Sequence, residues 1–420
     1  MLLVPLAAAA VVGTVWGAIR FFPFDGIVPV VIAALAGMAI LALPMPKIAR
    51  IAVGLVFGIA VRFVAYKSLA GPPDIADTPL NLLLSAHVLA GQGLTIDLDG
   101  YGPHIRGMYP PVYILALAAT QAMGGIALQL NIVADLAASA ALYRLSSGNE
   151  KVAIAYFLFP SVVLASLVPL KEELAVALML IAMCSVRRPL LFGALAGLIA
   201  LTQPAWTPVP LVAFLILERR TKAIALALLA AIAVLLPWWV RNALVFHHFV
   251  PLTTSAGFSL WVAVFGTYRT ATTVPMNEVA MSWETGRAAL AAIGADPAAY
   301  LHRIVTTAAH NFALNSEMSY FVGRDRAPWV ASSANVADAA WAALLVWSAA
   351  KRADVDRRWL AFAAGWSVAI FLGLWMEFGQ RHRAFAVPLL LLWICAQPRM
   401  RPLSLLLSNA ALTRRQAHVG

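Results

Sequence analysis

The amino-acid sequence predicts an all-α polytopic membrane protein, with about 12 transmembrane helices and with interfacial helices in two long outer loops. Hydrophobic residues make up 62% of the 420 residues and charged residues only 12%, whereas soluble domains average about 45–50% and about 25%. The mean hydropathy is +0.83. Because one span needs about 20 largely apolar residues, a chain of this composition has room for many crossings.

Apolar runs mark the expected spans. They lie at roughly 3–19, 27–43, 51–67, 126–143, 152–169, 173–186, 190–203, 205–217, 223–239, 333–350, 359–376 and 384–397. The first run has the apolar core of a signal peptide but no basic residue before Arg20. We therefore expect a retained membrane helix there.

The basic residues predict the orientation. Lys and Arg total 30 against 19 acidic residues, a formal net charge of +11, which in so apolar a chain indicates cytoplasmic loops and not a nucleic-acid partner. The short basic connections are Lys47 and Arg50, Arg144 and Lys151, Arg187 and Arg188, Arg219 to Lys222, Lys351 to Arg358, and the tail from Arg399 to Arg415. Twelve crossings with the N-terminus inside place all of them in the cytoplasm.

The stretch 109–125 would spoil this parity if it crossed the membrane, so we expect a re-entrant or interfacial helix that begins at Pro110-Pro111. Two long outer segments remain, 68–109 and 240–332. TPLNLLLSAHVLAGQG in the first predicts an amphipathic surface helix. The second predicts two surface helices broken at Asp296-Pro297.

Four regions follow from this organisation. They are an N-terminal hairpin at 1–50, a transmembrane module at 51–254 with its first outer loop at 68–109, a long outer loop at 255–332, and C-terminal helices with a tail at 333–420. The two cysteines, Cys184 and Cys395, lie near the expected cytoplasmic ends of apolar runs and predict no disulfide.

Cations gather at the outer membrane edge, where topology disfavours them. These are Arg106, Lys171, Arg241, Arg381 and Arg383. They suggest a bound anion, and phosphate at a membrane surface is the obvious one. The alternative is that the side chains snorkel to lipid headgroups.

Acidic residues at the same face are fewer. Asp77 opens the predicted surface helix, and Glu172 and Glu173 follow Lys171 at a tight turn. A carboxylate held near cations stays ionised and can act as a general base. The alternative for Asp77 is a helix cap before Thr78-Pro79.

No metal site is predicted from local spacing. His247 and His248 are adjacent, and His302 and His310 lack an H-E-x-x-H pattern. A divalent metal held by distant residues such as Asp77 and His104 stays open, and no other cofactor is expected. The chain also lacks a P-loop and a nucleophile elbow.

An ordered set of motifs resembles C-type (GT-C) glycosyltransferases of family 39, the protein-mannosyltransferase-like membrane enzymes. The segments are DTPLNLLLSAHVLAGQGLTIDLDGYGPHIRGMYPPVYILALAA, LVPLKEELAVALMLIAM, FGALAGLIALTQPAWTPVPL, LLPWWVRNALVFHHFVPLTTSAGFSLWVAVFG and GQRHRAFAVPLLLLW. The likeness runs from about 70 to 397, and PWWVRN is its most specific part. Gln203 stands where the family usually has arginine, His382 where it usually has tyrosine, and Asp77 lacks an adjacent acidic residue.

This resemblance implies an inverting transferase that takes a sugar from a polyprenyl-phosphate carrier on the periplasmic face of a bacterial inner membrane. Asp77 matches the catalytic aspartate. The expected phosphate-binding residues are Arg241, Lys171, Arg381, Arg383 and Arg106, and the expected substrate contacts are Glu172, Tyr109, His104, Asn242, His382 and Gln203. The partners would be the lipid-linked donor, membrane lipids, and an acceptor that is a glycan, a lipid or a protein.

Two competing functions stay open at this point. A lipid or anion transporter would also need cations in a polytopic bundle, although transporters place their sites near the bilayer midplane, and this chain concentrates its polar groups at one face. A scaffold subunit without activity is the third interpretation, motivated by the departures at Gln203 and His382.

Overall fold

The computed structural model describes residues 37, 39–68, 77–98, 102–265, 277–311, 357–374, 387, 388 and 391. The elements are α3 (Lys47–Ser68), α4 (Thr78–Leu89), β1 (Ile96–Leu98), β2 (Gly102–Ile105), α5 (Pro111–Ala122), α6 (Ala127–Leu145), α7 (Glu150–Phe157), α8 (Pro160–Ser166), α9 (Glu172–Cys184), α10 (Pro189–Thr202), the 3-10 helix η1 (Pro204–Trp206), α11 (Pro208–Leu217), α12 (Thr221–Phe246), α13 (Ala256–Phe265), α14 (Glu278–Ala295), α15 (Pro297–Asn311) and α18 (Arg357–Leu374). These residues are mostly helical, as the sequence predicts. The expected spans at 3–19 and 333–350 lie outside them, as do most of 27–43 and 384–397.

Within the described ranges, two helices are long and apolar enough to cross a membrane, α3 and α12. The pair α5 and α6 passes the same test together, but its helices meet at 118° across a short break, as in a broken span or a re-entrant loop. This geometry agrees with a re-entrant helix at 109–125 without distinguishing it from a broken span. The number of 12 crossings stays a prediction.

Two predicted spans are interrupted. The run 152–169 forms α7 and α8, and Pro160, which begins α8, has no amide hydrogen to continue the preceding helix. The run 205–217 contains η1 before α11. By contrast, α12 is longer than the predicted 223–239 and continues through Pro237 and the whole PWWVRN motif.

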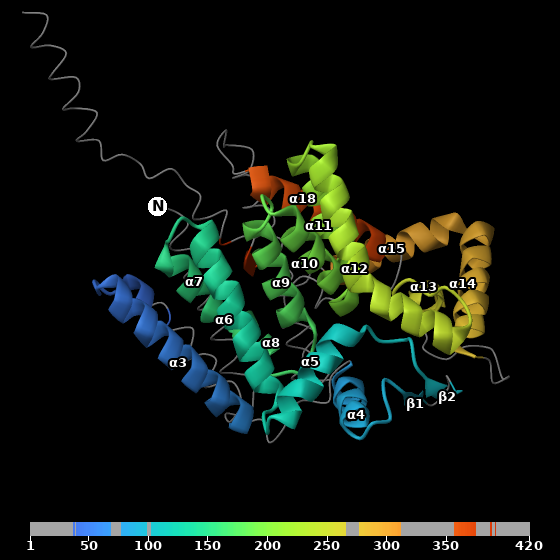
Figure 1. Cartoon of the computed structure of the whole chain (residues 1–420), viewed down its shortest axis with the longest axis horizontal. Coiled ribbons are helices and arrows are strands. Elements are labelled where there is room, and N and C mark those ends of the chain that lie inside the picture. The colour runs from blue at the N-terminus through green and yellow to red at the C-terminus, as the bar shows by residue number, and fades with distance from the viewer. Residues whose placement is uncertain are drawn as a thin grey trace, which may run out of the picture.

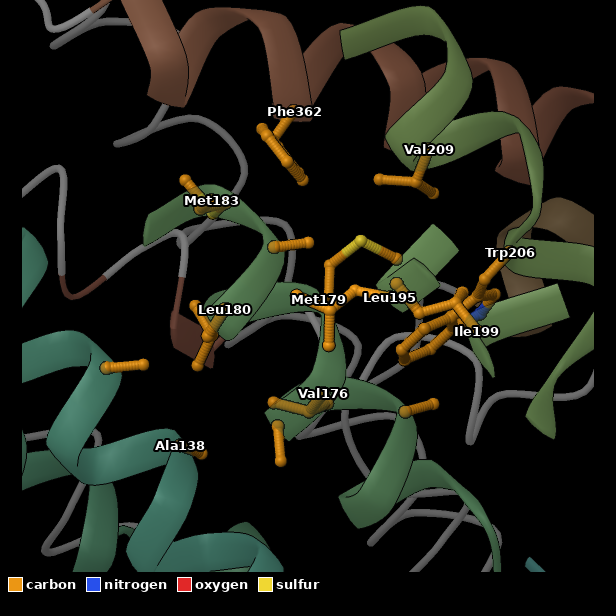
Figure 2. Packing of buried hydrophobic residues seen from close by; sticks show 14 of the residues in the cluster. Ala138, Val176, Met179, Leu180, Met183, Leu195, Ile199, Trp206, Val209 and Phe362 are labelled. Atoms are coloured by element: carbon orange, nitrogen blue, oxygen red, sulfur yellow. The ribbon is translucent and has the colours of Figure 1, made fainter. Parts of the chain in front are cut away.

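The helices α6, α9, α10 and α12 form the centre of the bundle, each packed on the next (Figure 1). Their shared core includes Met179, Leu180 and Ile199, with Trp206 and Phe362 closing it from η1 and α18 (Figure 2). The contact between α10 and α12 depends on small residues, since a Cβ at Gly193 would lie 2.0 Å from the Ala227 carbonyl oxygen. Such close backbone approach drives helix association where lipid offers no hydrophobic gain.

One end of the bundle carries α4, the β1–β2 hairpin and α5, at the bottom of Figure 1. The segment predicted as a surface helix is helical, as α4, and Gly91 and Gly93 follow it with φ of 73° and 76°. The hairpin pairs Ile96 with Ile105 and was not predicted. Its side chains pack with Leu84 of α4 in one apolar cluster.

The segment predicted as the long outer loop contains the two predicted helices, α14 and α15. They break at Asp296-Pro297, where the Asp296 carboxylate accepts a hydrogen bond from the Ala299 amide at 2.9 Å. A further helix, α13, precedes them and packs closely on α14, because Gly257 lies under Ser282 with no room for a side chain.

Candidate functional site

Asp77 lies beside Lys171 at the end of the bundle that carries α4. The Asp77 carboxylate is 3.6 Å from the Lys171 ammonium group, and the side chains are 21% and 11% exposed. Asp77 occupies the N-cap position of α4, yet its side chain makes no capping hydrogen bond. The helix-cap interpretation of this residue is therefore wrong, and the carboxylate is directed to a cation that begins another helix.

The turn that carries Lys171 is fixed by two buried asparagines. The Asn81 side chain of α4 donates to the Pro169 carbonyl at 3.0 Å. Asn131 of α6 donates to the carbonyls of Ser166 and Val168 at 3.1 and 2.7 Å. Helices α4 and α6 thus hold the turn that carries Lys171.

Glu172 and Glu173 begin α9 and are only 2% and 4% exposed. Tyr113 of α5 lies within electrostatic reach of both carboxylates. Two acidic residues in a first helical turn are stabilised by the helix dipole. The sequence predicts Glu172 as a substrate contact, and the structure places it inside the protein next to the Asp77–Lys171 pair.

The PWWVRN motif binds a neighbouring main-chain segment. The indole nitrogens of Trp238 and Trp239 donate to the carbonyls of Leu252 and Pro251 at 2.6 and 2.7 Å. The Asn242 side chain donates to the Val250 carbonyl at 2.9 Å. Asn242 is fully buried, so this expected substrate contact instead holds the segment 250–252 against the end of α12.

Arg241 and Arg106 lie within electrostatic reach of each other. The Arg241 guanidinium lies over the Trp238 ring, 4.7 Å from its centroid, and donates to the Asn242 side-chain oxygen at 2.9 Å. Arg106 and Glu278 both interact electrostatically with Arg241. The two arginines come from segments more than a hundred residues apart, and both were predicted as phosphate ligands.

Glu278 joins the segment after β2 to the segment before α13 and was not predicted from the sequence. Its carboxylate accepts hydrogen bonds from the Arg106 amide, the Gly107 amide and the Thr254 hydroxyl, each at 2.8 Å. The Thr254 amide in turn donates to the Gly107 carbonyl at 2.8 Å. Two of the donors to Glu278 are main-chain groups, which leave no signal in a sequence.

Gly107 is required by close packing. A Cβ at this position would lie 2.7 Å from the Phe246 ring, which is closer than atoms pack. The end of α12 and the segment between β2 and α5 therefore meet at Gly107.

The other predicted residues have different surroundings. Tyr109 is half-buried and lines, with Arg106 and Leu84, a hollow of about 10 Å³, which holds one water at most. Gln203 is 2% exposed at the end of α10, and its side-chain nitrogen has no hydrogen-bond partner among the described residues. His104 lies in β2. Arg381, His382 and Arg383 lie outside the described residues altogether.

A buried ion pair inside the bundle was not predicted. Arg62 of α3 donates to the Asp135 carboxylate at 2.8 Å, and both side chains are fully buried. Arg62 also donates to the Ser166 hydroxyl at 3.0 Å and to the Gly58 carbonyl at 3.1 Å. This network links α3, α6 and α8, and Ser166 is also held through its carbonyl by Asn131.

Among the described residues, no group of three His, Cys, Asp or Glu side chains is arranged to hold a metal ion. A metal held by Asp77 together with His104 therefore stays a hypothesis. The sequence matches no protein-family model and no curated protein, and the fold matches no solved structure. Functional inference accordingly depends on the chemistry of the residues themselves.

Proposed function

We propose that this chain is an inverting membrane glycosyltransferase, which moves a sugar from a polyprenyl-phosphate carrier to an acceptor hydroxyl on the periplasmic face of the bacterial inner membrane. The observation that carries the proposal is the Asp77–Lys171 pair. The Asp77 side chain precedes α4 without making a capping hydrogen bond, and it lies 3.6 Å from the Lys171 ammonium group. A carboxylate in this position can act as a general base.

The proposed reaction divides the work between two groups of residues. Asp77 accepts the proton of the acceptor hydroxyl while that oxygen attacks the anomeric carbon of the sugar. The bond from that carbon to the phosphate oxygen breaks, and the phosphate leaves with the electron pair. Arg106 and Arg241 stabilise the charge that develops on it. Lys171 pairs with the Asp77 carboxylate at 3.6 Å and so positions it.

The resemblance of the motifs to GT-C enzymes supports the same assignment, and so does the grouping of base and cations. Asp77 begins α4, and Arg106 follows the β1–β2 hairpin that packs on α4. Both belong to one outer segment at one end of the bundle (Figure 1). If the donor phosphate binds at Arg106, the sugar would lie toward α4, which Asp77 precedes.

The decisive experiment incubates purified protein with radiolabelled polyprenyl-phosphate sugars and a crude envelope extract as the source of acceptor. Transfer of label that Asp77→Asn abolishes and Asp97→Asn retains supports the proposal. Asp97 is a suitable control because it is an exposed carboxylate of β1 in the same segment. Parallel reactions with a chelator and with added Mg²⁺ or Mn²⁺ test the metal hypothesis. No transfer from any donor would contradict the proposal.

A lipid or anion transporter is the second candidate, and the buried Arg62–Asp135 pair favours it. Ionisable residues inside membrane helices commonly mark transport pathways. In this chain, however, both side chains are fully buried and bound to each other, to Ser166 and to Gly58. Reconstitution in vesicles with a fluorescent polyprenyl-phosphate lipid distinguishes the candidates, because a transporter moves the lipid between leaflets without any acceptor.

A further inference from the structure

The strongest unassigned feature is the binding site that encloses the Glu278 carboxylate. Two main-chain amides and one hydroxyl donate to it at 2.8 Å, and the Arg241 guanidinium attracts it. Main-chain amides, a hydroxyl and guanidinium groups are the donors that proteins use to bind phosphate oxygens. The chain thus contains a complete anion site, which one of its own carboxylates fills.

Glu278 is not needed to complete its own helix. It is the first residue of α14, but the cap is Asn277, whose side chain accepts the Ala280 amide at 2.8 Å. Its carboxylate is directed instead to Arg106 and Gly107, more than 170 residues away in sequence. α14 therefore does not require this carboxylate to remain where it is.

The charges around the site are unbalanced. The Arg241 guanidinium interacts electrostatically with the Arg106 cation and with the Glu278 carboxylate, so the charges of these three groups sum to +1. A phosphate group brings at least the same charge and more oxygen acceptors than a carboxylate, so it would satisfy these donors at least as well.

We propose that Glu278 is an internal substitute for the phosphate of a lipid ligand, and that this phosphate binds at Arg106, Gly107, Thr254 and Arg241 by displacing the Glu278 carboxylate. The inference rests on the proposed function for the identity of the ligand. Displacement is a rotation of the Glu278 side chain. α14 itself stays in place, because Gly257 and Ser282 fix it on α13 through a hydrogen bond of 3.1 Å and close backbone contact.

The test measures binding without any sugar transfer. Wild-type protein and Glu278→Gln are titrated in nanodiscs with polyprenyl phosphate, with uncharged polyprenol and with inorganic phosphate. The amide of glutamine keeps the shape but loses the charge that competes with the ligand. We expect at least about a tenfold gain in affinity for polyprenyl phosphate, a difference of about 1.4 kcal/mol, and no gain for polyprenol. A matching gain for inorganic phosphate would identify free phosphate as a ligand, and its absence would identify the lipid headgroup.

A purely structural role for Glu278 predicts the opposite sign. If its carboxylate only fastens the outer segments together, Glu278→Gln loosens Arg106 and Gly107, and the affinity falls or stays the same. Either result would overturn the inference. Glu284→Gln is the matched control, since Glu284 lies on the same helix and pairs with the exposed Arg287 at 2.6 Å, and its affinity should equal that of wild type.

A substitute variant and a comparison with the transfer assay make the result interpretable. If Glu278→Gln does not fold, as judged by size-exclusion chromatography, Glu278→Asp replaces it, because the shorter side chain withdraws from the amides and should give a smaller gain of the same sign. Failure of this inference can also be distinguished from failure of the proposed function. Tighter phosphate binding in a protein that transfers no sugar refutes only the proposed function, whereas normal transfer with unchanged phosphate affinity refutes only this inference.

Discussion

The Asp77 carboxylate and the Lys171 ammonium group lie 3.6 Å apart, and they join the first residue before α4 to the first residue before α9. The sequence predicts separate roles for them, Asp77 as base and Lys171 as phosphate ligand. Their pairing changes the second role. In the proposed reaction Lys171 therefore pairs with the base Asp77, and Arg106 and Arg241 would bind the phosphate.

The first prediction concerns Asp77. Replacing it by asparagine retains the side-chain volume and removes the proton acceptor, so transfer should fall at least about 10²-fold, the usual contribution of a general base. The measurement is the initial rate of label transfer, with Asp97→Asn as the matched control. Because Asp77 does not cap α4, the melting temperature of the variant should stay close to that of wild type. A near-normal rate would assign the proton transfer to another residue.

The second prediction concerns Arg241. Its guanidinium is fixed between the Trp238 ring and Asn242, and an arginine can bind two phosphate oxygens where a lysine binds one. Arg241→Lys should therefore lower kcat/KM for the lipid donor at least about tenfold, roughly 1.4 kcal/mol of transition-state stabilisation. Arg287→Lys, at an exposed pair on α14, should change nothing measurable. Equal and small effects would favour anchoring to lipid headgroups.

The third prediction concerns topology. Residues 68–109 and 240–332 should lie opposite Arg187, Arg219 and Arg352. Single cysteines at Gln92 and Arg187, both exposed, are introduced after Cys184 and Cys395 have been replaced. A membrane-impermeant maleimide added to intact spheroplasts should label the first and not the second until the membrane is opened. Labelling of both positions from outside would disprove the proposed orientation.

The fourth prediction concerns the buried ion pair. Arg62→Leu or Asp135→Leu leaves one charge without its partner in a fully buried position, and each should cost about 3–5 kcal/mol of unfolding free energy. The double variant should lose much less than the sum, since neither charge then remains. The quantity to compare is the denaturation midpoint in detergent. Strictly additive losses would show that the two side chains stabilise the bundle independently.

The fifth prediction concerns pH and the connection between α11 and α12. Hydrogen bonds from Arg220, at 2.7 and 2.8 Å from its side chain, lower the pKa of Glu218 to about 2. A carboxylate with a lowered pKa adds stability above its ordinary pKa, and this contribution is lost as the pH falls toward the lowered value. The stability difference between wild type and Glu218→Gln should thus shrink between pH 5 and pH 2. The difference will be small and sensitive to salt, because the Arg220 side chain is 72% exposed.

The helices were predictable where one periodic or apolar pattern decides the structure. α4, α14 and α15 follow from apolar spacing and from Pro79 and Pro297 near their first turns. The break between α7 and α8 was missed because residues 152–169 are apolar on both sides of Pro160, and apolarity alone does not show whether a helix continues. The β1–β2 hairpin was missed because its strands have only 3 and 4 residues.

The candidate site was predictable in its side chains but not in their pairing. Asp77, Lys171, Arg106 and Arg241 were named from charge at the outer face, yet the contacts among them join segments far apart in sequence. Glu278 had no signal, because its partners are mainly amides that every residue carries. Arg62 lies within an apolar run and forms its ion pair through a fold that brings α3 onto α6.

The hydrogen bonds from α12 to the segment 250–252 all end on main-chain carbonyls. Every residue has a main-chain carbonyl, so these hydrogen bonds require particular side chains only at Trp238, Trp239 and Asn242. Positions 251 and 252 are not buried, and they can therefore carry a fluorophore or a spin label while the end of α12 keeps its shape. Such a probe would report movement at the Arg241 side of the protein without occupying any of its polar groups.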